Sequence, residues 1–329
     1  MRFYTNVHEA YCGIDWHART RYVCLLNRDG EILLHRHRPT TPEIFLKAIA
    51  PDRQDLVVAV ECLLTWYWLA DLCAPDGLTC VLGHAQYMKA IHGGKAKHDR
   101  LDAQKSAVLL RGGMLPQAYA YPAAMRATRE LLRRRLHLVR QRAERVTHLR
   151  QPNSQYHVPA LGKSLQSKAP REGVAQRFSD PAVQKTLEVD LALSDYADRV
   201  LRDLEHPILT AAQQHAPQTR ARLRSVPGIG PILSLVLLYE IHDSHWFPRV
   251  QDFASYGRVV TCAPESAGKR YGTSGHKIGN VHLKWAFSEA AVLFLVDHPL
   301  GQQYYGRLEN KYGPGKALTV LAHQLARAV

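Results

Sequence analysis

The segment 55–61, with the sequence DLVVAVE, constrains the fold of this chain more than any other stretch. Its apolar residues follow one another almost without interruption, whereas a strand with one face in water alternates apolar and polar residues. A run of this kind is typical of a strand that is covered on both faces. We therefore expect a buried strand inside an α/β domain.

The segments around this strand predict the rest of the domain. The sequence NRDG at 27–30 is a turn signal between two strands. Thr40 or Thr41 is expected to cap the first helix, with Pro42 in its first turn. Besides the strand at 55–61, we expect strands at 11–15, 21–27, 31–37 and 78–82. Helices are expected at 41–50, 64–73, 84–91 and 98–111. This mixed sheet with a leading antiparallel meander is compatible with a ribonuclease-H-like fold, although many α/β folds share its elements.

The rest of the chain has a helical pattern. A long basic helix is expected at 123–151 and a second long helix at 182–215, and the two are expected to form a coiled coil. The segment 151–180 between them is rich in Pro, Ser, Gly, Gln and Lys and is expected to be a loop. A mainly helical domain follows, with helices at 232–242, 281–297 and 316–329. The predicted domains are residues 1–115, 116–218 and 219–329.

The composition indicates a polyanionic partner. The formal net charge is +14, and nine arginines but only two glutamates lie between Tyr121 and Arg150. Such clustering favours nucleic acid over a merely solvated basic surface, and Arg133, Arg134 and Arg135 are the candidate contacts. None of the six cysteines forms a C-x-x-C pair, and no apolar run is long enough to cross a membrane. We expect a cytoplasmic protein. The last helix has no stop signal, so we expect the natural chain to extend slightly further.

Four carboxylates stand at positions where they can converge. Asp15 ends the first predicted strand and Glu61 the fourth, while Asp99 and Asp102 lie three residues apart early in a helix and so share one face. Two divalent ions held by carboxylates can activate an attacking oxygen and stabilise a leaving oxygen in phosphodiester transfer. The alternative interpretation is that these are ordinary exposed acids at strand ends and helix starts.

Two further motifs suggest contacts with phosphate. In VPGIGP at 226–231, Gly228 and Gly230 resemble a helix-hairpin-helix turn, whose glycines permit a close backbone approach; a simple turn between helices is the alternative. In ESAGKRYG at 265–272, Ser266 is a candidate nucleophile beside the cations Lys269 and Arg270. A surface loop is the alternative, and Thr273, Ser274 and Ser288 are other hydroxyls.

In combination, these motifs resemble those of DEDD-type insertion-sequence transposases, the insertion-sequence-110 family. The resemblance rests on GIDWH at 13–17, VAVE at 58–61, the K-x-D-x-x-D-A segment 97–103 and two C-terminal blocks, SVPGIGPILSLVLLYEI and ESAGKRYGTSGHKIGNVHLKWAFSEAA. It covers nearly the whole chain. It implies a RuvC-like N-terminal domain, similar to Holliday-junction resolvases, and a C-terminal domain with a nucleophilic serine. Position by position, the tetrad is Asp15, Glu61, Asp99 and Asp102, and the serine is Ser266.

The resemblance also implies an activity and partners. Such enzymes cleave and exchange DNA strands through a phosphoserine intermediate, with Mg²⁺ or Mn²⁺ at the tetrad. A structured guide (bridge) RNA directs them to donor and target DNA, and homodimers pair into tetramers. The implied location is the bacterial cytoplasm, at the nucleoid during activity. Two alternatives stay open: a resolvase-like metal-dependent nuclease that uses the tetrad alone, and a non-catalytic nucleic-acid-binding protein.

Overall fold

The computed structural model describes residues 2–17, 19–63, 65–91, 98–161, 165, 169–213, 215–260, 265–270 and 278–329. The chain forms two compact units, Met1–Ala123 and Ala124–Val329. No helix among the described residues is long and apolar enough to cross a membrane.

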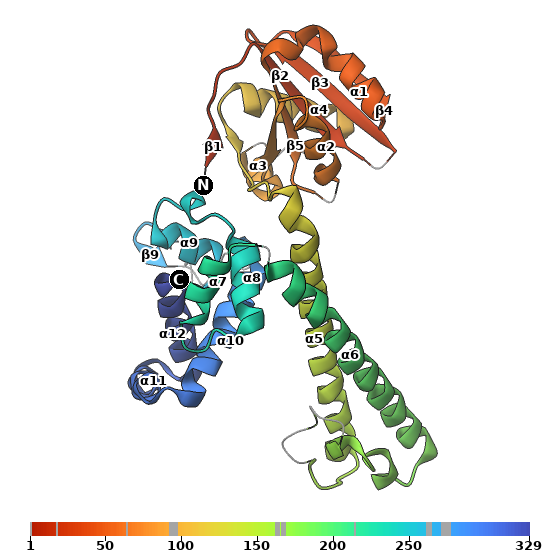
Figure 1. Ribbon diagram of the computed structural model, residues 1–329, viewed down its shortest axis with the longest axis vertical. Helices are drawn as coiled ribbons and strands as arrows, with labels where there is room; N and C mark the ends of the chain where they lie inside the picture. Colours follow the sequence, from red (N-terminus) through yellow and green to blue (C-terminus); the bar gives the residue numbers. More distant parts are fainter. Residues whose placement is uncertain are drawn as a thin grey trace. The chain divides into compact units, whose positions relative to one another are not determined.

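A five-stranded mixed sheet forms the centre of the first unit (Figure 1). Its strands are β2 (Ala10–Trp16), β3 (Thr20–Asn27), β4 (Ile32–Pro39), β5 (Leu56–Glu61) and β6 (Thr79–Gly83). Their order across the sheet is β4-β3-β2-β5-β6. The strand β3 is antiparallel to its neighbours β2 and β4. The strand β5 is parallel to its neighbours β2 and β6. All five strands were predicted from the sequence. Four of them carry a strong local apolar pattern, whereas β4 has apolar residues only in its first half and none of its residues is buried.

Helices cover both faces of this sheet. They are α1 (Pro42–Ile49), α2 (Trp66–Cys73), α3 (Ala85–Ile91) and α4 (Asp99–Arg111). On one face, Phe45 of α1 and Leu69 of α2 pack with Ile14 of β2 in one core. On the other face, Met88 of α3 and Leu109 of α4 belong to a second core. Residues 56–60 of β5 are all buried, which confirms the expectation for the segment that the sequence marks most strongly.

Two short features of this unit were not predicted. The strands β1 (Phe3–Tyr4) and β7 (Leu115–Pro116) pair antiparallel, and each is only two residues long. A pairing this short leaves no periodic pattern to detect.

At the start of α1, Thr41 occupies the N-cap position, but its side chain makes no capping hydrogen bond. Instead, its carbonyl oxygen accepts hydrogen bonds from Arg21.

Two long helices, α5 (Ala123–Gln155) and α6 (Pro181–Gln213), begin the second unit. The described part of the segment between them, which includes residues 169–180, is more ordered than its loop-like composition predicts. It holds the short 3₁₀ helices Ala169–Arg171 and Ala175–Arg177, and its Phe178 is buried with Leu149 of α5. Arg171 is buried as well, and its Nη1 atom donates hydrogen bonds to two aspartates of α6. Apolar contacts and the ion pairs of the buried Arg171 therefore hold the described part of this segment in place.

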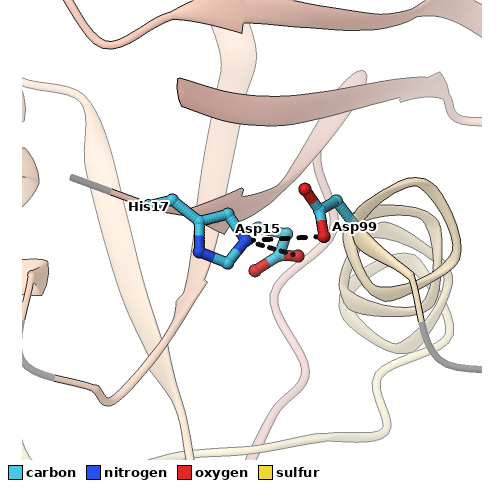
Figure 2. Close-up of side chains that lie close together, drawn as sticks. All are labelled: Asp15, His17 and Asp99. Carbon is cyan, nitrogen blue, oxygen red and sulfur yellow. Dashed lines mark ion pairs between the residues drawn. The ribbon is translucent and has the colours of Figure 1, made fainter. Parts of the chain in front are cut away.

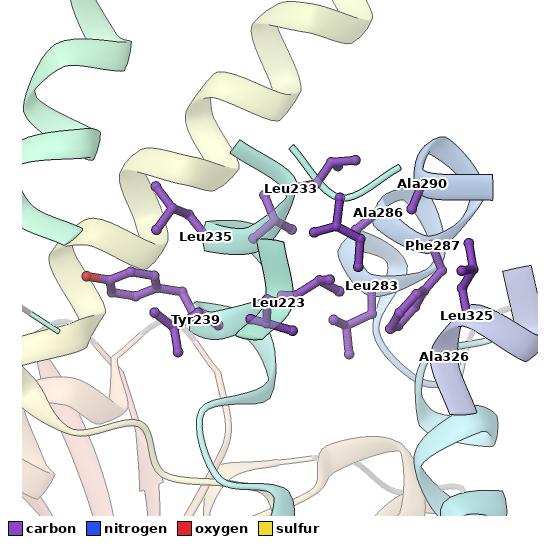
Figure 3. Packing of buried hydrophobic residues seen from close by; sticks show 14 of the residues in the cluster. Leu223, Leu233, Leu235, Tyr239, Leu283, Ala286, Phe287, Ala290, Leu325 and Ala326 are labelled. Atoms are coloured by element: carbon purple, nitrogen blue, oxygen red, sulfur yellow. The ribbon is translucent and has the colours of Figure 1, made fainter. Parts of the chain in front are cut away.

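The rest of the second unit is helical. It contains α7 (Pro217–Arg224), α8 (Pro231–Ile241), α9 (Val250–Tyr256), α10 (Val281–Asp297), α11 (Pro299–Tyr312) and α12 (Pro314–Ala328). The helix α8 is buried along almost its whole length, as its uninterrupted apolar sequence predicts. Leu233 of α8 meets Phe287 of α10 and Leu325 of α12 in a common core (Figure 3). Two short strands, β8 (Glu265–Ser266) and β9 (Lys269–Arg270), form a hairpin.

Candidate active site

The parallel strands β2 and β5 deliver two of the predicted carboxylates to one edge of the sheet. The last registered residue pair between these strands is Ile14 with Val60. Asp15 and Glu61 directly follow these two residues, so both carboxylates leave the sheet at the carboxyl ends of parallel neighbours. Such an edge is a common location for functional groups, because neighbouring strand ends bring distant parts of the sequence together.

The helix α4 supplies the other two carboxylates from its first turn, which contains Asp99 and Asp102. This helix lies very close to β2. A Cβ atom at Gly13 would lie 2.2 Å from the carbonyl oxygen of Ala103 and 2.3 Å from the amide nitrogen of Ala107. Only a glycine in the strand permits this approach, since a Cβ atom does not come within 3 Å of backbone atoms. Gly13 therefore fixes how near α4 comes to the sheet edge.

The imidazole of His17 lies between two of these carboxylates (Figure 2). Its Nε2 atom is 3.4 Å from Oδ2 of Asp15 and 3.5 Å from Oδ1 of Asp99. Ligand atoms of the three residues all lie within 4.8 Å of one another. Glu61, at the end of β5, and Asp102 are not members of this group of three in the described part of the chain.

Sequence reasoning did not identify His17, because an isolated histidine is usually a surface or polar packing residue. A usable signal is its position two residues after Asp15, at the place where the strand ends.

The charged side chains of this site differ in their exposure to solvent. The Asp15 side chain is only 17% exposed, whereas those of His17 and Asp99 are about half exposed, at 52% and 48%. Burial raises the pKa of Asp15, the negative charges of Asp99 and Asp102 raise it further, and His17 opposes them. Asp102 also accepts a hydrogen bond from Nζ of Lys105 at 3.3 Å. The negative charges at the start of α4 therefore oppose ionisation of Asp15.

The donor set suits a divalent metal ion. Carboxylate oxygens are the preferred ligands of Mg²⁺ and Mn²⁺, and imidazole nitrogen binds first-row transition ions. Burial and the negative charges of α4 raise the pKa of Asp15, and a cation would oppose both effects because an opposite charge favours the ionised carboxyl group. Asp15 and Asp99, with His17 beside them, are the residues that best fit this role.

The predicted nucleophile Ser266 lies in the hairpin β8–β9. Ser266 pairs with Lys269 across the strands, and both are exposed. The two residues between them, Ala267 and Gly268, have positive φ angles of 50° and 73°. Two consecutive residues of this kind form the tight turn typical of two-residue hairpins. The side chain of Arg270, like Thr273 and Ser274, lies outside the described residues, and Ser288 is part of α10.

The glycines of the segment 226–231 differ in their surroundings. Gly228 has a φ of +85°, and a Cβ atom there would lie 2.4 Å from the carbonyl oxygen of Ala290 in α10. The close approach that Gly228 permits is therefore to another helix of the protein. No atom lies within 4 Å of the Cβ position of Gly230, which precedes α8 and faces open space. Two cations in the last turn of the preceding helix α7, Arg222 and Arg224, are exposed.

The three arginines predicted on the basic helix do not share one environment. Arg133 contacts the buried carboxylate of Glu240, with its Nε atom 2.7 Å from Oε1. Arg135 forms an ion pair with Glu205 of α6. Both side chains thus make contacts within the protein, and nucleic-acid contact by Arg133 and Arg135 stays a prediction. Arg134, which is exposed, remains a candidate contact.

Glu240 is the centre of a polar network that the sequence did not reveal. Its carboxylate also accepts hydrogen bonds from Arg129 at 2.9 Å and from Nδ2 of Asn280 at 2.7 Å. Asn280 in turn caps α10 by accepting hydrogen bonds from the amides of His282 and Leu283. Burial alone raises the pKa of Glu240, but the hydrogen bond from Arg133 and the two guanidinium charges outweigh it and lower the pKa. The network joins α5, α8 and the start of α10.

Comparisons with known protein families agree with this arrangement. Residues 12–157 match the family of DEDD transposases named for IS110, and residues 220–306 match the transposase IS116/IS110/IS902 family. The first match includes all four predicted carboxylates, and the second includes Ser266. Among proteins with curated descriptions, none matches this chain.

Proposed function

The chain belongs to the IS110 family of DEDD transposases and is a DNA transposase, and we propose that it exchanges DNA strands through a phosphoserine intermediate at Ser266. In this proposal a divalent metal site at the edge of the five-stranded sheet assists the reaction. The observation that carries it is the meeting of Asp15 and Asp99 at His17. Asp15 comes from β2, Asp99 from the first turn of α4 and His17 from the segment directly after β2.

The topology of the sheet supports a RuvC-like assignment for the first unit. The order β4-β3-β2-β5-β6, with β3 as the antiparallel strand, places a three-stranded meander beside two parallel crossovers. In this arrangement the first and fourth strands of the sheet, β2 and β5, are neighbours. A carboxylate at the end of each is the pattern that a ribonuclease-H-like metal site requires.

Each residue has a defined role in the proposed reaction. Asp15, Glu61, Asp99 and Asp102, supplied by a second copy of the chain, would hold Mg²⁺ or Mn²⁺, whose positive charge would activate the serine and stabilise the leaving group. The Oγ atom of Ser266 attacks phosphorus, so that an Oγ–P bond forms while one P–O bond to a deoxyribose breaks. The hydroxyl proton leaves Ser266 to a base, and the departing deoxyribose oxygen takes up a proton. Lys269, opposite Ser266, lies where its ammonium group can stabilise the negative charge on the phosphate.

The nucleic-acid partners are proposed from charge and exposure. The formal net charge of +14 favours a polyanion. The candidate phosphate contacts lie in the second unit. They are the exposed cations Arg134, Arg222, Arg224 and Lys269, together with the half-buried Gly230 at the start of α8. Phosphate contacts position a nucleic acid without reading its sequence. A guide RNA that pairs with donor and target DNA would supply that specificity, and assembly into dimers and tetramers would bring two reaction centres together.

The test is to trap the covalent intermediate. The protein is incubated with Mg²⁺, RNA transcribed from the flanks of its own element and matching DNA, and a protein–DNA adduct is sought on a denaturing gel. The native protein is expected to form the adduct, Ser266→Ala to form none, and Ser266→Cys to retain a nucleophile at the same position. Cleavage by the native protein without an adduct would replace the proposal with a nuclease that uses the carboxylates alone.

A further inference from the structure

We propose that His17 is itself a ligand of the metal centre and that its nitrogen biases the site toward Mn²⁺ over Mg²⁺. The inference rests on the proposed metal-dependent function. It adds to the four carboxylates a residue of different chemistry, placed between Asp15 and Asp99.

The spacing of the three donors fits a shared ion. A metal about 2.1 Å from each ligand keeps adjacent ligand atoms roughly 3.0 Å apart in octahedral geometry and about 3.4 Å apart in tetrahedral geometry. The observed separations from Nε2 of His17 are 3.4 Å to Asp15 and 3.5 Å to Asp99. These separations exceed the usual 2.7–3.2 Å of an N–H···O hydrogen bond. An ion bound by all three atoms therefore requires shifts of only a few tenths of an ångström.

The backbone of His17 is held in place on both sides of its side chain. Its amide donates a hydrogen bond to the carbonyl oxygen of Thr20 at 3.0 Å. Its carbonyl oxygen accepts a hydrogen bond from Oγ1 of Thr40 at 3.1 Å. These contacts join the end of β2 to the start of β3 and to the segment after β4, so the imidazole projects from a fixed point. The side chain is 52% exposed, which leaves space for water or substrate oxygens to complete the coordination of an ion.

The chemistry of the donors predicts the metal preference. Mg²⁺ favours oxygen ligands in near-ideal octahedral geometry and gives up its water reluctantly. Imidazole nitrogen suits first-row transition ions, for which affinity rises from Mn²⁺ onward along the series. A site with two carboxylates and one imidazole therefore favours Mn²⁺ more strongly than a site built from carboxylates alone. Replacing the nitrogen by an oxygen donor should weaken this preference.

The experiment uses the full chain and Mn²⁺ as the probe. Electron spin echo modulation of the bound Mn²⁺ is expected to show coupling to a ¹⁴N nucleus, and calorimetry gives the affinities for Mn²⁺ and Mg²⁺. His17→Ala should abolish the nitrogen coupling and weaken Mn²⁺ binding by about 10- to 100-fold, the range seen when groups that support metal ligands are removed. The affinity for Mg²⁺ should change less. His17→Asp should retain Mg²⁺ binding without any nitrogen coupling.

His245 offers a matched control. It is an exposed histidine beside an aspartate, with Nδ1 3.0 Å from Oδ1 of Asp243, and it belongs to the other unit. His245→Ala should leave both affinities and the nitrogen coupling unchanged. Mn²⁺ that binds without nitrogen coupling, with the same affinity in His17→Ala, would refute His17 as a ligand but leave the metal site intact. Failure of both ions to bind the native protein, with Asp15→Asn behaving identically, would overturn the metal-dependent function as well.

Discussion

The contact between Gly13 and α4 leads to a prediction that links packing directly to the site. In Gly13→Ala, the added methyl group would lie 2.2 Å from the carbonyl oxygen of Ala103 and 2.3 Å from the amide nitrogen of Ala107. Carbon atoms in favourable contact with other heavy atoms lie about 3.5–4.0 Å apart. Both obstacles are backbone atoms of α4, so no side-chain rotation can relieve the clash. The helix must therefore retreat by roughly 1 Å or more from β2.

This displacement has a cost in stability and a cost in function. Overpacking of a well-packed core destabilises a protein by about 1–3 kcal/mol. The retreat also carries Asp99, on the first turn of α4, away from Asp15 and His17. A misplacement of about 1 Å at a reaction centre is sufficient for a rate loss on the order of 100-fold. We expect Gly13→Ala to lower the free energy of unfolding by about 1–3 kcal/mol and to weaken Mn²⁺ binding and adduct formation.

Urea unfolding, Mn²⁺ calorimetry and the adduct gel measure these three quantities. Gly306→Ala is the control, because Gly306 lies inside α11 with no atom within 4 Å of its Cβ position. There the same change should stabilise the helix by about 0.5–1 kcal/mol. If Gly13→Ala unfolds like the native protein and binds Mn²⁺ with the same affinity, then α4 does not depend on this glycine and the reasoning is refuted.

Three further predictions concern the other polar features. Asp15→Asn should stabilise the metal-free protein at neutral pH. The pKa of Asp15 is raised in the folded protein, so its ionisation lowers the free energy of unfolding as the pH rises through that pKa. Thermal unfolding in the presence of a chelator tests this, and equal stability of the native protein and the variant would refute it. Glu240→Gln should cost about 3–5 kcal/mol, because it leaves the buried guanidinium of Arg129 facing a neutral amide. Because the pKa of Glu240 is lowered, its ionised carboxylate should stabilise the fold fully at pH values above the usual pKa of Glu, and this stabilisation should be lost as the pH falls. The free energy of unfolding of Glu240→Gln, measured against pH, should therefore lack this loss of stability in acid. Ala267→Gly should preserve adduct formation while Ala267→Val lowers it, because residue 267 has a positive φ that β-branched side chains resist; equal yields would indicate that the hairpin turn is not required.

Local sequence determined the five strands of the central sheet and the places of Asp15, Glu61, Asp99 and Asp102 on the elements of the first unit. The strand at 56–61 and the helix that starts at Asp99 can each be recognised from their own residues, without reference to the segments that pack against them. Because parallel strand ends share one edge, the placement of Asp15 and Glu61 followed from the same patterns. The hairpin around Ser266 was visible only as a motif, because two-residue strands have no measurable periodicity.

Tertiary structure alone decided what several side chains do. The distance between His17 and Asp99 depends on how closely α4 approaches β2, which Gly13 controls across ninety residues of sequence. In the same way, Arg133 belongs to a basic run in the sequence, but in the fold it forms a partly buried ion pair with Glu240, 107 positions away. Local patterns report the preference of a segment for helix or strand. The partner of a charged or small residue is set by which segments pack together, and that depends on the fold as a whole.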